Sequence, residues 1–354
     1  MKQESAPRPI IVYGAYGHTG RFIVGELLEK GFLPVLVGRD GEKLEALSSA
    51  HGGLRVQVVA LDDSNALNDA LHGVDAVINA AGPFAETASR VVEAAIGAGV
   101  PYLDVAAEPD IVATTMARHG ERARQAGIAL APGIAFYGGL GDLLATAAMG
   151  DWPQADEITL AYHLSSWKPT LGTRATIEVA EKRRGGQRLV FRNQQLELRT
   201  DAAPSTEWDF PPPIGKQAVT AEFTTADAVT MSRHLKVQEI SEYMTLAPLR
   251  DLSDPDLSQP RAVDARGRSA QTFLVEAIVR VGNQRRRAVA QGQDIYAVTA
   301  PLVVEALQRL LAQPQQRRGI VTAGELGDAR SFLEALVPRH LTLGIEPRSA
   351  AEAS

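Results

Sequence analysis

Short apolar runs alternate with longer mixed segments through the first 131 residues of the chain. The apolar runs have the length of strands and few polar positions, which is typical of strands buried on both faces of a sheet. The segments between them have the length and polar content of helices. The predicted strands are 10–13, 33–39, 55–59, 75–79, 102–105 and 128–131, and the predicted helices are 22–28, 42–50, 65–71, 87–98 and 111–126.

This alternation of strand and helix, repeated with short links, predicts the fold class. Parallel strands need crossover connections, and helices make those connections. The pattern therefore predicts an α/β protein with a Rossmann-type, doubly wound parallel sheet that carries helices on both faces.

Near Asp151 the pattern changes to short alternating strands with few helices. Residues 157–164 read as a strand, and 173–184 as an amphipathic helix. Residues 273–281 and 286–291 read as two strands joined by Gly282-Asn283, which resembles a hairpin turn. Strands in succession predict an inserted α+β domain built on a mainly antiparallel sheet.

The tail returns to α/β character. Thr299 can cap a helix that runs to Leu311, with Pro301 in its first turn. A strand at 320–322 and a helix at 328–336 follow. We therefore expect a nucleotide-binding domain over 1–150, an inserted substrate or dimerisation domain over 151–292, and a C-terminal segment over 293–354 that returns to the first domain.

Composition removes several classes of protein. The net charge of −6 gives no reason to expect nucleic acid or an anionic membrane as a partner. No run of eighteen apolar residues occurs, so no membrane span is expected. The chain has no cysteine, which excludes disulfides and thiolate chemistry. The first nine residues are polar and read as a lead-in without the apolar core of a signal peptide, so a cytoplasmic location is the expectation.

A glycine-rich turn follows the first strand and opens a helix. Gly14 allows a sharp turn, Gly17 lets a pyrophosphate approach the backbone, and Gly20 lets the helix pack against the strand. The amides and the positive dipole end of the helix then face the phosphates. Many glycine turns only join a strand to a helix. This turn predicts nucleotide binding because it lies within an extended series of alternating strands and helices.

The second strand indicates which cofactor binds. It ends in Gly38-Arg39-Asp40, without the acidic residue at its end that would bind the ribose 2′-hydroxyl of NAD. Arg39 can pair with a 2′-phosphate and stack on adenine, which favours NADP over NAD. A plain surface charge beside Asp40 is the alternative. Asp62 follows the third strand, at the adenine edge. A cap of the next helix is an equally good explanation for this acidic segment, and it suits Asp63 or Ser64 better than Asp62.

Two further turns mark the nicotinamide end. Small residues after the fourth strand, Ala81-Gly82-Pro83, allow the backbone to run beside the nicotinamide ribose, unless they form only a tight turn. Asp104 and Glu108 follow the fifth strand. A carboxylate there can orient an amine or hydroxyl of a substrate, or it can hold a loop.

The insert offers weaker candidates. Gly172 and Thr173 begin a helix whose amides can bind an anionic group, or which is an ordinary helix start. Tyr162, His163 and Lys168 lie nearby and can transfer a proton. No tyrosine is followed four residues later by a lysine, so the short-chain dehydrogenase apparatus is missing. The sequence does not identify the catalytic group. No spacing of histidines and carboxylates suggests a metal site.

Four motifs of the first domain occur together in one known family. They are Gly14-Ala15-Tyr16-Gly17-His18-Thr19-Gly20-Arg21, Gly38-Arg39-Asp40, Asn79-Ala80-Ala81-Gly82-Pro83-Phe84, and Tyr102-Leu103-Asp104 with Glu108. In this combination the sequence resembles the NADP-binding domain of the saccharopine dehydrogenase-like family, most closely over residues 8–150. Pieces at 132–144, 172–173 and 292–300 resemble the family's linker, helix start and return.

The resemblance implies an NADP-binding fold with an inserted mixed domain. Members of the family include saccharopine reductases, which reduce an imine, and relatives include trans-acting enoyl reductases of lipid synthesis. The linker 131–141 lacks the polar run of the lipid-associated branch, and the insert shows no carboxylate clamp, so the family name does not give the substrate. The motifs imply these cofactor-binding residues: Gly14, Tyr16, Gly17, His18, Thr19, Gly20, Arg39, Asp62, Ala81, Gly82 and Pro83.

The sequence therefore favours an NADPH-dependent oxidoreductase that reduces a carbonyl, imine or activated alkene of a small-molecule substrate. A redox sensor or scaffold that binds NADP without turnover is the alternative, and a cofactor-dependent lyase or epimerase is a third reading. An exposed antiparallel sheet in the insert would offer a surface for a homodimer.

Overall fold

The computed structural model describes residues 9–254 and 258–346, so residues 1–8 of the expected lead-in lie outside the described residues. The chain divides into two compact units. The first comprises the chain up to Ala135 together with 170–182 and 299–322, and the second comprises 136–169, 183–298 and the chain from Ala323. The domain boundaries at residues 150 and 292 that the sequence favours stay predictions.

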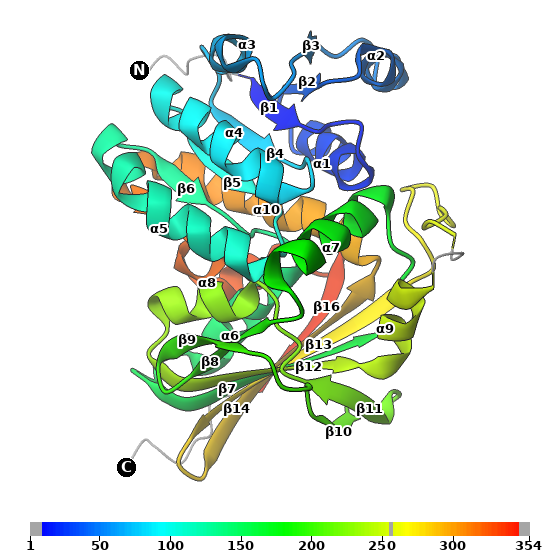
Figure 1. The fold of residues 1–354 in the computed structure, drawn as a ribbon, viewed down its shortest axis with the longest axis vertical. Coiled ribbons are helices and arrows are strands. Elements are labelled where there is room, and N and C mark those ends of the chain that lie inside the picture. Colours follow the sequence, from blue (N-terminus) through cyan, green and yellow to red (C-terminus); the bar gives the residue numbers. More distant parts are fainter. Residues whose placement is uncertain (1–8, 255–257, 347–354) are drawn as a thin grey trace. The chain divides into compact units, whose positions relative to one another are not determined.

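The first unit contains the predicted parallel sheet (Figure 1). Helices α7 and α10 belong to it for most of their length. Its elements are β1 (Ile10–Tyr13), α1 (His18–Glu29), β2 (Pro34–Gly38), α2 (Gly41–Ala50), β3 (Val56–Val58), α3 (Ser64–Ala70), β4 (Ala76–Asn79), α4 (Phe84–Ala98), β5 (Tyr102–Asp104), α5 (Pro109–Ala126), β6 (Ala129–Ala131), α7 (Leu171–Arg184), α10 (Ile295–Ala312), the 3₁₀ turn η2 (Pro314–Gln316) and β15 (Gly319–Ile320).

The strand order of this sheet fixes where a ligand can bind. Seven strands run in the order β15-β6-β5-β4-β1-β2-β3, and every neighbouring pair is parallel. The chain leaves β1 toward β2 on one side and reaches β4 on the other. A gap between the connections opens at that switch point, outside the carboxyl ends of the strands. The doubly wound α/β fold expected from the sequence is confirmed.

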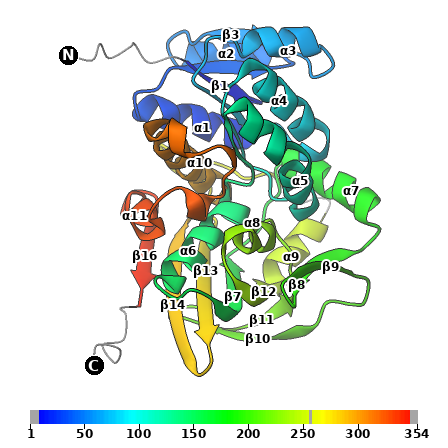
Figure 2. The same ribbon diagram turned by 90° about the vertical axis from the view of Figure 1, so that its left-hand side faces the viewer.

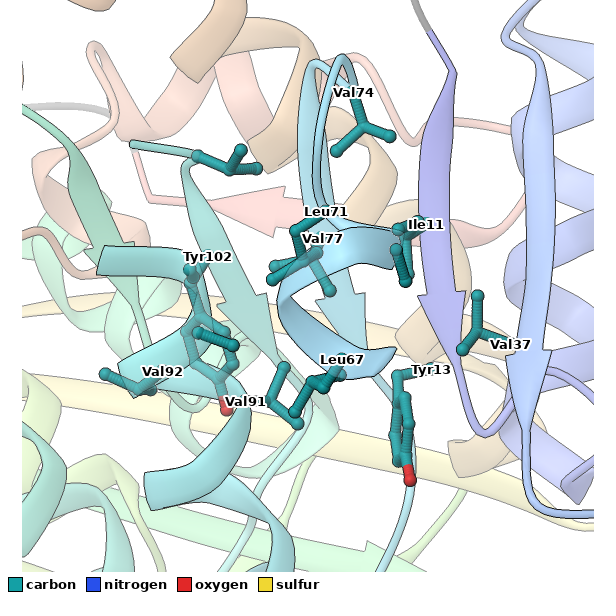
Figure 3. Packing of buried hydrophobic residues seen from close by; sticks show 14 of the residues in the cluster. Ile11, Tyr13, Val37, Leu67, Leu71, Val74, Val77, Val91, Val92 and Tyr102 are labelled. Carbon is teal, nitrogen blue, oxygen red and sulfur yellow. The ribbon is translucent and has the colours of Figure 1, made fainter. Parts of the chain in front are cut away.

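One face of this sheet is covered by α3, α4 and α5, which pack on alternate strand residues (Figure 3). Ile11 and Val77 project from neighbouring strands onto Leu71 at the end of α3, and all three are almost fully buried. Period-two alternation places the other strand residues on the opposite face. Burial on both faces explains why these strands read as continuous apolar runs.

The second unit is built on a mixed, mainly antiparallel sheet (Figure 2). Its strands run in the order β10-β11-β12-β7-β13-β14-β16, and the β8–β9 hairpin joins through β12. Its elements are the π-helix η1 (Phe136–Leu140), α6 (Gly141–Met149), β7 (Ala155–Leu164), β8 (Arg188–Arg192), β9 (Gln195–Arg199), β10 (Ser205–Phe210), β11 (Gly215–Ala221), α8 (Asp227–His234), β12 (Val237–Thr245), α9 (Leu246–Ser253), β13 (Thr272–Val281), β14 (Gln284–Gln293), the 3₁₀ turn η3 (Ala323–Glu325), α11 (Ala329–Glu334) and β16 (Leu341–Ile345).

The hairpin predicted around Gly282-Asn283 forms as β13 and β14, and the mainly antiparallel sheet is confirmed. One pair differs: β12 lies beside β7 in parallel register. The tail contributes to both units, since β15 pairs with β6 while β16 pairs with β14.

The start of α10 corrects the sequence prediction. The helix begins at Ile295, four residues before Thr299, and contains Pro301 in its interior. Asp294 supplies the cap: its Oδ1 accepts hydrogen bonds from the amides of Tyr296 and Ala297 at 2.9 and 3.1 Å. Asp294 also has a φ of 63°, a value that lies outside the helical range. The sequence prediction chose the hydroxyl nearer the proline and overlooked this aspartate.

Among the described residues, α10 alone has the length and apolar composition of a membrane span. However, 67% of it is buried inside the protein, as is usual for a core helix.

Leu71 and Leu33 provide a matched test of the first core. Leu71 is fully buried in the cluster, whereas Leu33 is 54% exposed. We expect Leu71→Ala to lower the free energy of unfolding by about 2–5 kcal/mol, because a cavity replaces packed methyl groups. Leu33→Ala should change it by less than about 0.5 kcal/mol. Denaturant titration of both variants measures this, and similar losses would show that the cluster is loosely packed.

Candidate functional site

Three glycines shape the turn between β1 and α1. Gly14 has a φ of +85°, and a Cβ at this position would come within 2.8 Å of the Ala81 amide nitrogen. A Cβ on Gly20 would overlap the carbonyl oxygen of Gly14. A Cβ on Gly17 would lie 3.1 Å from that same oxygen. The turn is thus a backbone cradle in which side chains would collide, as the spacing predicts for a phosphate loop.

The helix that leaves this cradle presents its first amides without a side-chain cap. Gly17 is the N-cap, and no acidic residue occurs in the first turn of α1. His18 begins the helix and packs edge-to-face on Phe22, with ring centroids 5.4 Å apart. Thr19, half-buried, follows in the same turn. Uncapped amides at the positive end of a helix dipole fit a pyrophosphate, so the residues present fit the cofactor predicted from the sequence.

Arg39 and Asp40 follow the carboxyl end of β2. Arg39 is exposed, and no hydrogen bond or ion pair joins it to another described residue. Asp40 caps α2 instead of facing the cradle: it accepts from the Lys43 amide at 3.1 Å and pairs with the Lys43 ammonium at 2.7 Å. The Tyr16 ring lies against Gly38, where a Cβ would approach it to 2.8 Å.

Asp62 follows β3 and stays exposed. The cap of α3 is its neighbour Asp63, whose Oδ1 accepts from the Ala66 amide at 2.9 Å. Of the two residues that the sequence favoured for this cap, Asp63 and Ser64, Asp63 makes it. Asp62 acts electrostatically on the Tyr13 hydroxyl, whose pKa is raised mainly by burial.

A buried asparagine holds the turn after β4. Asn79 is fully buried, and its Oδ1 accepts from the amide of Ala81 at 3.1 Å. The Thr87 hydroxyl donates to the Ala81 carbonyl at 2.6 Å. Gly82 and Pro83 complete the turn and lead into α4, whose N-cap, Pro83, has no side-chain hydrogen bond. This role of Asn79 was not predicted from the sequence. The feature that could have indicated it is an amide side chain at the end of an apolar strand.

Asp104 ends β5 and is fully buried. Its Oδ2 accepts from the Tyr102 hydroxyl at 2.7 Å, and its Oδ1 accepts from the amides of Ala106 and Gly133 at 3.0 and 2.7 Å. Burial raises the pKa of this carboxyl, and the three donors oppose the increase. These contacts favour the second role left open by the sequence, in which Asp104 holds the loops after β5 and β6.

Glu108 accepts hydrogen bonds from backbone amides, whereas Asp104 also accepts one from a hydroxyl group. It is the N-cap residue of α5, but its side chain makes no capping bond. Its Oε2 accepts from the adjacent Ala107 amide at 3.0 Å, and the amide of Phe84, at the start of α4, also stabilises its charge. Only 7% of the residue is exposed. Burial raises the pKa of Glu108 to about 7, and the charge of Asp104 adds to this increase.

The start of α7 lies beside the turn after β4. A Cβ on Gly82 would come within 3.2 Å of the Thr176 hydroxyl and 4.0 Å of the Gly172 carbonyl. The helix start predicted at Gly172-Thr173 is present, but Thr170 caps it: the Thr170 hydroxyl oxygen accepts from the Thr173 amide at 3.0 Å. The structure therefore brings two segments together that are separated by 90 residues.

In the second unit, a buried carboxyl pair surrounds Thr225. The Thr225 hydroxyl lies 2.6 Å from Asp227 Oδ2 and 2.8 Å from Glu242 Oε2. Burial raises the pKa of Asp227 to about 6 and raises that of Glu242 well above its usual range. Tyr162, a proton-transfer candidate from the sequence, is fully buried and donates to Asp227 at 2.8 Å.

The other two proton-transfer candidates lie apart from this pair. His163 packs 5.7 Å from the Phe210 ring, and burial lowers its pKa. Lys168 is exposed. Among the described residues, no group of three or more histidine, aspartate or glutamate side chains could hold a metal ion.

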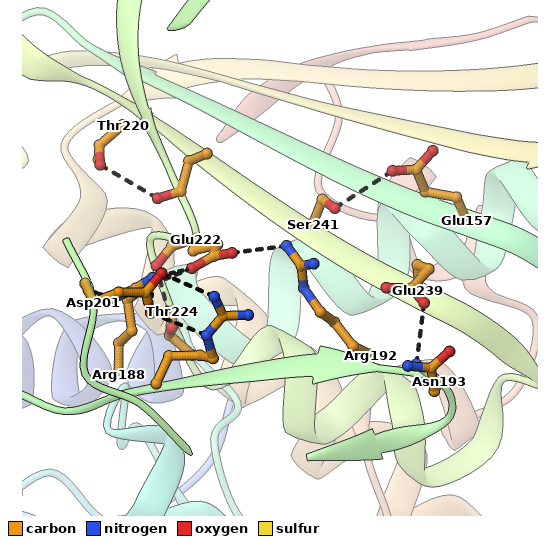
Figure 4. A network of polar contacts seen from close by, with 12 residues as sticks. Glu157, Arg188, Arg192, Asn193, Asp201, Thr220, Glu222, Thr224, Glu239 and Ser241 are labelled. Atoms are coloured by element: carbon orange, nitrogen blue, oxygen red, sulfur yellow. Dashed lines mark hydrogen bonds and ion pairs between the residues drawn. The ribbon is translucent and has the colours of Figure 1, made fainter. Parts of the chain in front are cut away.

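A cavity of about 310 Å³ lies within the second unit, and none of the predicted cofactor residues lines it. Its lining includes Phe191, Ile240 and Glu242. At its edge Arg188 and Arg192 both pair with Glu222, the latter at 2.8 Å (Figure 4). No sequence pattern predicts this network, because its members are separated by up to 34 residues.

The parallel sheet, its switch point and the uncapped helix behind a glycine cradle define a dinucleotide-binding protein of the Rossmann class. Residues 10–130 match the family described as "Saccharopine dehydrogenase NADP binding domain". This match agrees with the resemblance read from the four motifs, over the same part of the chain.

Curated relatives agree over the same part of the chain. The mouse saccharopine dehydrogenase-like oxidoreductase is 30% identical over 146 residues, covering 36% of this chain and 34% of the mouse protein. A Caenorhabditis elegans protein named "Lipid droplet localized protein" is 29% identical over 131 residues, covering 34% and 31%. The matched segment thus spans about a third of the length of these relatives.

A solved structure shares the fold more broadly. The apo saccharopine dehydrogenase (L-Glu forming) of Saccharomyces cerevisiae superposes with a TM-score of 0.65 and covers 96% of this chain and 100% of its own. The sequence identity is 9%, so this similarity concerns the fold alone.

The raised pKa of Glu108 predicts a pH-dependent stability. Between pH 4.5 and about 7 the folded protein keeps the Glu108 proton while the unfolded chain has lost it, so this group's contribution declines as pH rises through that window. Glu108→Gln cannot lose a proton. The free energy of unfolding of this variant, relative to the parent, should therefore rise with pH by on the order of 3 kcal/mol.

Denaturant titrations at several pH values measure this difference. Glu93→Gln, at an exposed position of α4, is the control and should show no such rise. A difference between parent and Glu108→Gln that stays constant with pH would show that Glu108 ionises normally.

Proposed function

We propose that this chain is an NADPH-dependent oxidoreductase that transfers a hydride to a carbonyl, imine or activated alkene of a small molecule. Two findings support the general class: residues 10–130 match an NADP-binding domain family, and relatives matched over this part are named oxidoreductases. The substrate and the reaction are part of the proposal.

The proposal rests mainly on the charged residues that follow β2. Arg39 is exposed there with no protein partner among the described residues, while Asp40 is held in the cap of α2 by Lys43. A dinucleotide whose pyrophosphate lies on α1 has its adenosine ribose at the end of β2. A cationic, unpaired guanidinium suits a 2′-phosphate, whereas NAD would call for a carboxylate there.

The remaining predicted residues take places along the same sheet edge. Gly14, Gly17 and Gly20 form the cradle, and His18 and Thr19 lie in the first turn of α1. Tyr16 and Asp62 lie at the adenosine side. Ala81, Gly82 and Pro83 follow β4, which is the nicotinamide side of the switch point.

When bound, the cofactor supplies the hydride. The chain's own residues orient it, exclude water and place an acceptor beside it. Asp104 acts here by holding the loops after β5 and β6, while Glu108, Gly172 and Thr173 remain the candidates for substrate contact. A redox sensor that binds NADP without turnover is the alternative, and NADPH oxidation measured with aldehydes, enones and mixtures of keto acid and amine separates the two.

Our proposals for cellular location and assembly are those expected from the sequence. We propose a cytoplasmic protein and a homodimer formed through the antiparallel sheet of the second unit. Size-exclusion chromatography with light scattering tests the dimer, and a monomer at all concentrations would remove it from the proposal.

Arg39→Ala tests the cofactor assignment. Loss of a charge-assisted contact with the 2′-phosphate should weaken NADPH binding about tenfold to a hundredfold. NADH has no 2′-phosphate, so its binding should change by less than about twofold. Fluorescence titration of both nucleotides gives the ratio directly.

Arg55→Ala is the matched control. Arg55 is also an exposed arginine of this unit, but it precedes β3 and so lies at the opposite, amino edge of the sheet. Its replacement should leave both affinities unchanged. Equal losses of NADPH and NADH in the Arg39 variant would contradict a role in reading the 2′-phosphate.

A further inference from the structure

We propose that Glu108 is a redox-linked proton site: it holds a proton when the nicotinamide cofactor is reduced, and it is a carboxylate when the cofactor is oxidised. The inference rests on the proposed function, because it requires NADP(H) to bind at the switch point. It adds a chemical role that the comparisons do not assign to any residue.

Glu108 lies near the turn assigned to the nicotinamide end of the cofactor. It follows β5, the neighbour of β4 on the nicotinamide side of the switch point. Its carboxyl group also interacts with the amide of Phe84, which directly follows the Gly82-Pro83 turn. The carboxyl therefore lies within one residue of the turn assigned to the nicotinamide end.

The groups around Glu108 stabilise its carboxylate form only weakly. Its protein donors are the backbone amides of its own loop and of Phe84, and Asp104 is the charged group that acts on it. Asp104 itself is already committed to Tyr102, Ala106 and Gly133. Only 7% of Glu108 is exposed, and no hydrogen bond or ion pair joins it to a cation within residues 9–254 and 258–346, so it lacks the charged partner that stabilises a buried carboxylate.

The charge of the nicotinamide ring provides the switch. The oxidised ring carries one positive charge, and the reduced ring is neutral. A unit positive charge within about 6 Å, at an effective dielectric of about 20, lowers the pKa of a carboxyl group by about two. Glu108, whose pKa in the unliganded protein is about 7, would then lose its proton above about pH 5 beside the oxidised ring and keep it up to about pH 7 beside the neutral, reduced ring.

This coupling balances the proposed reduction. The acceptor gains a hydride, which brings two electrons, from the reduced cofactor. The heteroatom or neighbouring carbon of the former double bond takes one proton from the Glu108 carboxyl group. Glu108 is left as the carboxylate that the positive ring stabilises, and it recovers a proton from solvent after the oxidised cofactor leaves.

The test compares the affinities of NADP⁺ and NADPH as a function of pH and needs no substrate. From about pH 6 to about pH 8, the affinity for NADP⁺ relative to NADPH should rise by a factor on the order of ten in the parent protein. Ionisation of the 2′-phosphate affects both nucleotides and cancels in the ratio. In Glu108→Gln the ratio should stay constant, and in the control Glu93→Gln it should follow the parent.

Calorimetry in two buffers of different ionisation enthalpy provides a second readout on the unmodified protein. At about pH 7, NADP⁺ binding should release about half a proton more than NADPH binding. This measurement decides the matter even if Glu108→Gln does not fold.

The outcomes separate the two proposals. If neither nucleotide binds, the proposed function fails and the proton site falls with it. If both bind but their affinity ratio is independent of pH, or varies equally in Glu108→Gln, the proton site is wrong while the proposed function stands.

Discussion

The close approach of Gly14 to Ala81 is the constraint on which the first unit depends. The turns after β1 and β4 meet there, at the switch point of the sheet, with no room for a Cβ on Gly14. The third glycine, Gly20, brings α1 equally close to the carbonyl of Gly14. Both contacts are backbone to backbone, so the position of the helix amides relative to the sheet edge is set without any intervening side chain.

Hydrogen bonds extend this constraint across the sheet edge. Asn79 fixes Ala81, and its Nδ2 donates to the Tyr102 hydroxyl at 3.3 Å. That hydroxyl donates to Asp104, which in turn holds Gly133 after β6. Buried polar groups thereby tie β4, β5 and the loop after β6 together in series, each group satisfied by the next. Such a series fixes the edge of the sheet on which a cofactor would lie.

Two carboxylates near this edge differ because their surroundings differ. Asp104 receives three hydrogen bonds, one from a hydroxyl and two from amides of separate loops, and it acts as a structural acceptor. Glu108, four residues later, accepts from backbone amides, and burial raises its pKa to about 7. The different contacts of the two carboxyl groups come from their surroundings and not from the residue type.

The sequence predicted what depends on local pattern. The strands and helices of the first unit, the glycine cradle and the β13–β14 hairpin all follow from neighbouring residues, and the structure contains them. The capping role of Asp63 and the placing of Asp104 depend on which donor lies closest in space, so the sequence left both open. The start of α10 was mistaken because a hydroxyl near Pro301 outweighed Asp294, whose cap follows from a backbone angle.

The second unit shows the same limit in a stronger form. The hydroxyl of Thr225 has one proton but lies within hydrogen-bonding distance of both Asp227 and Glu242. One of those two contacts must therefore use a carboxyl proton, which agrees with the raised pKa of Glu242. Strands β7 and β12 and the start of α8 bring these groups together from three separate segments. Alternation along β12 places Glu242 on the same face as Ile240 and Met244, which is the buried face, so its position follows from the strand while its partners come from the fold.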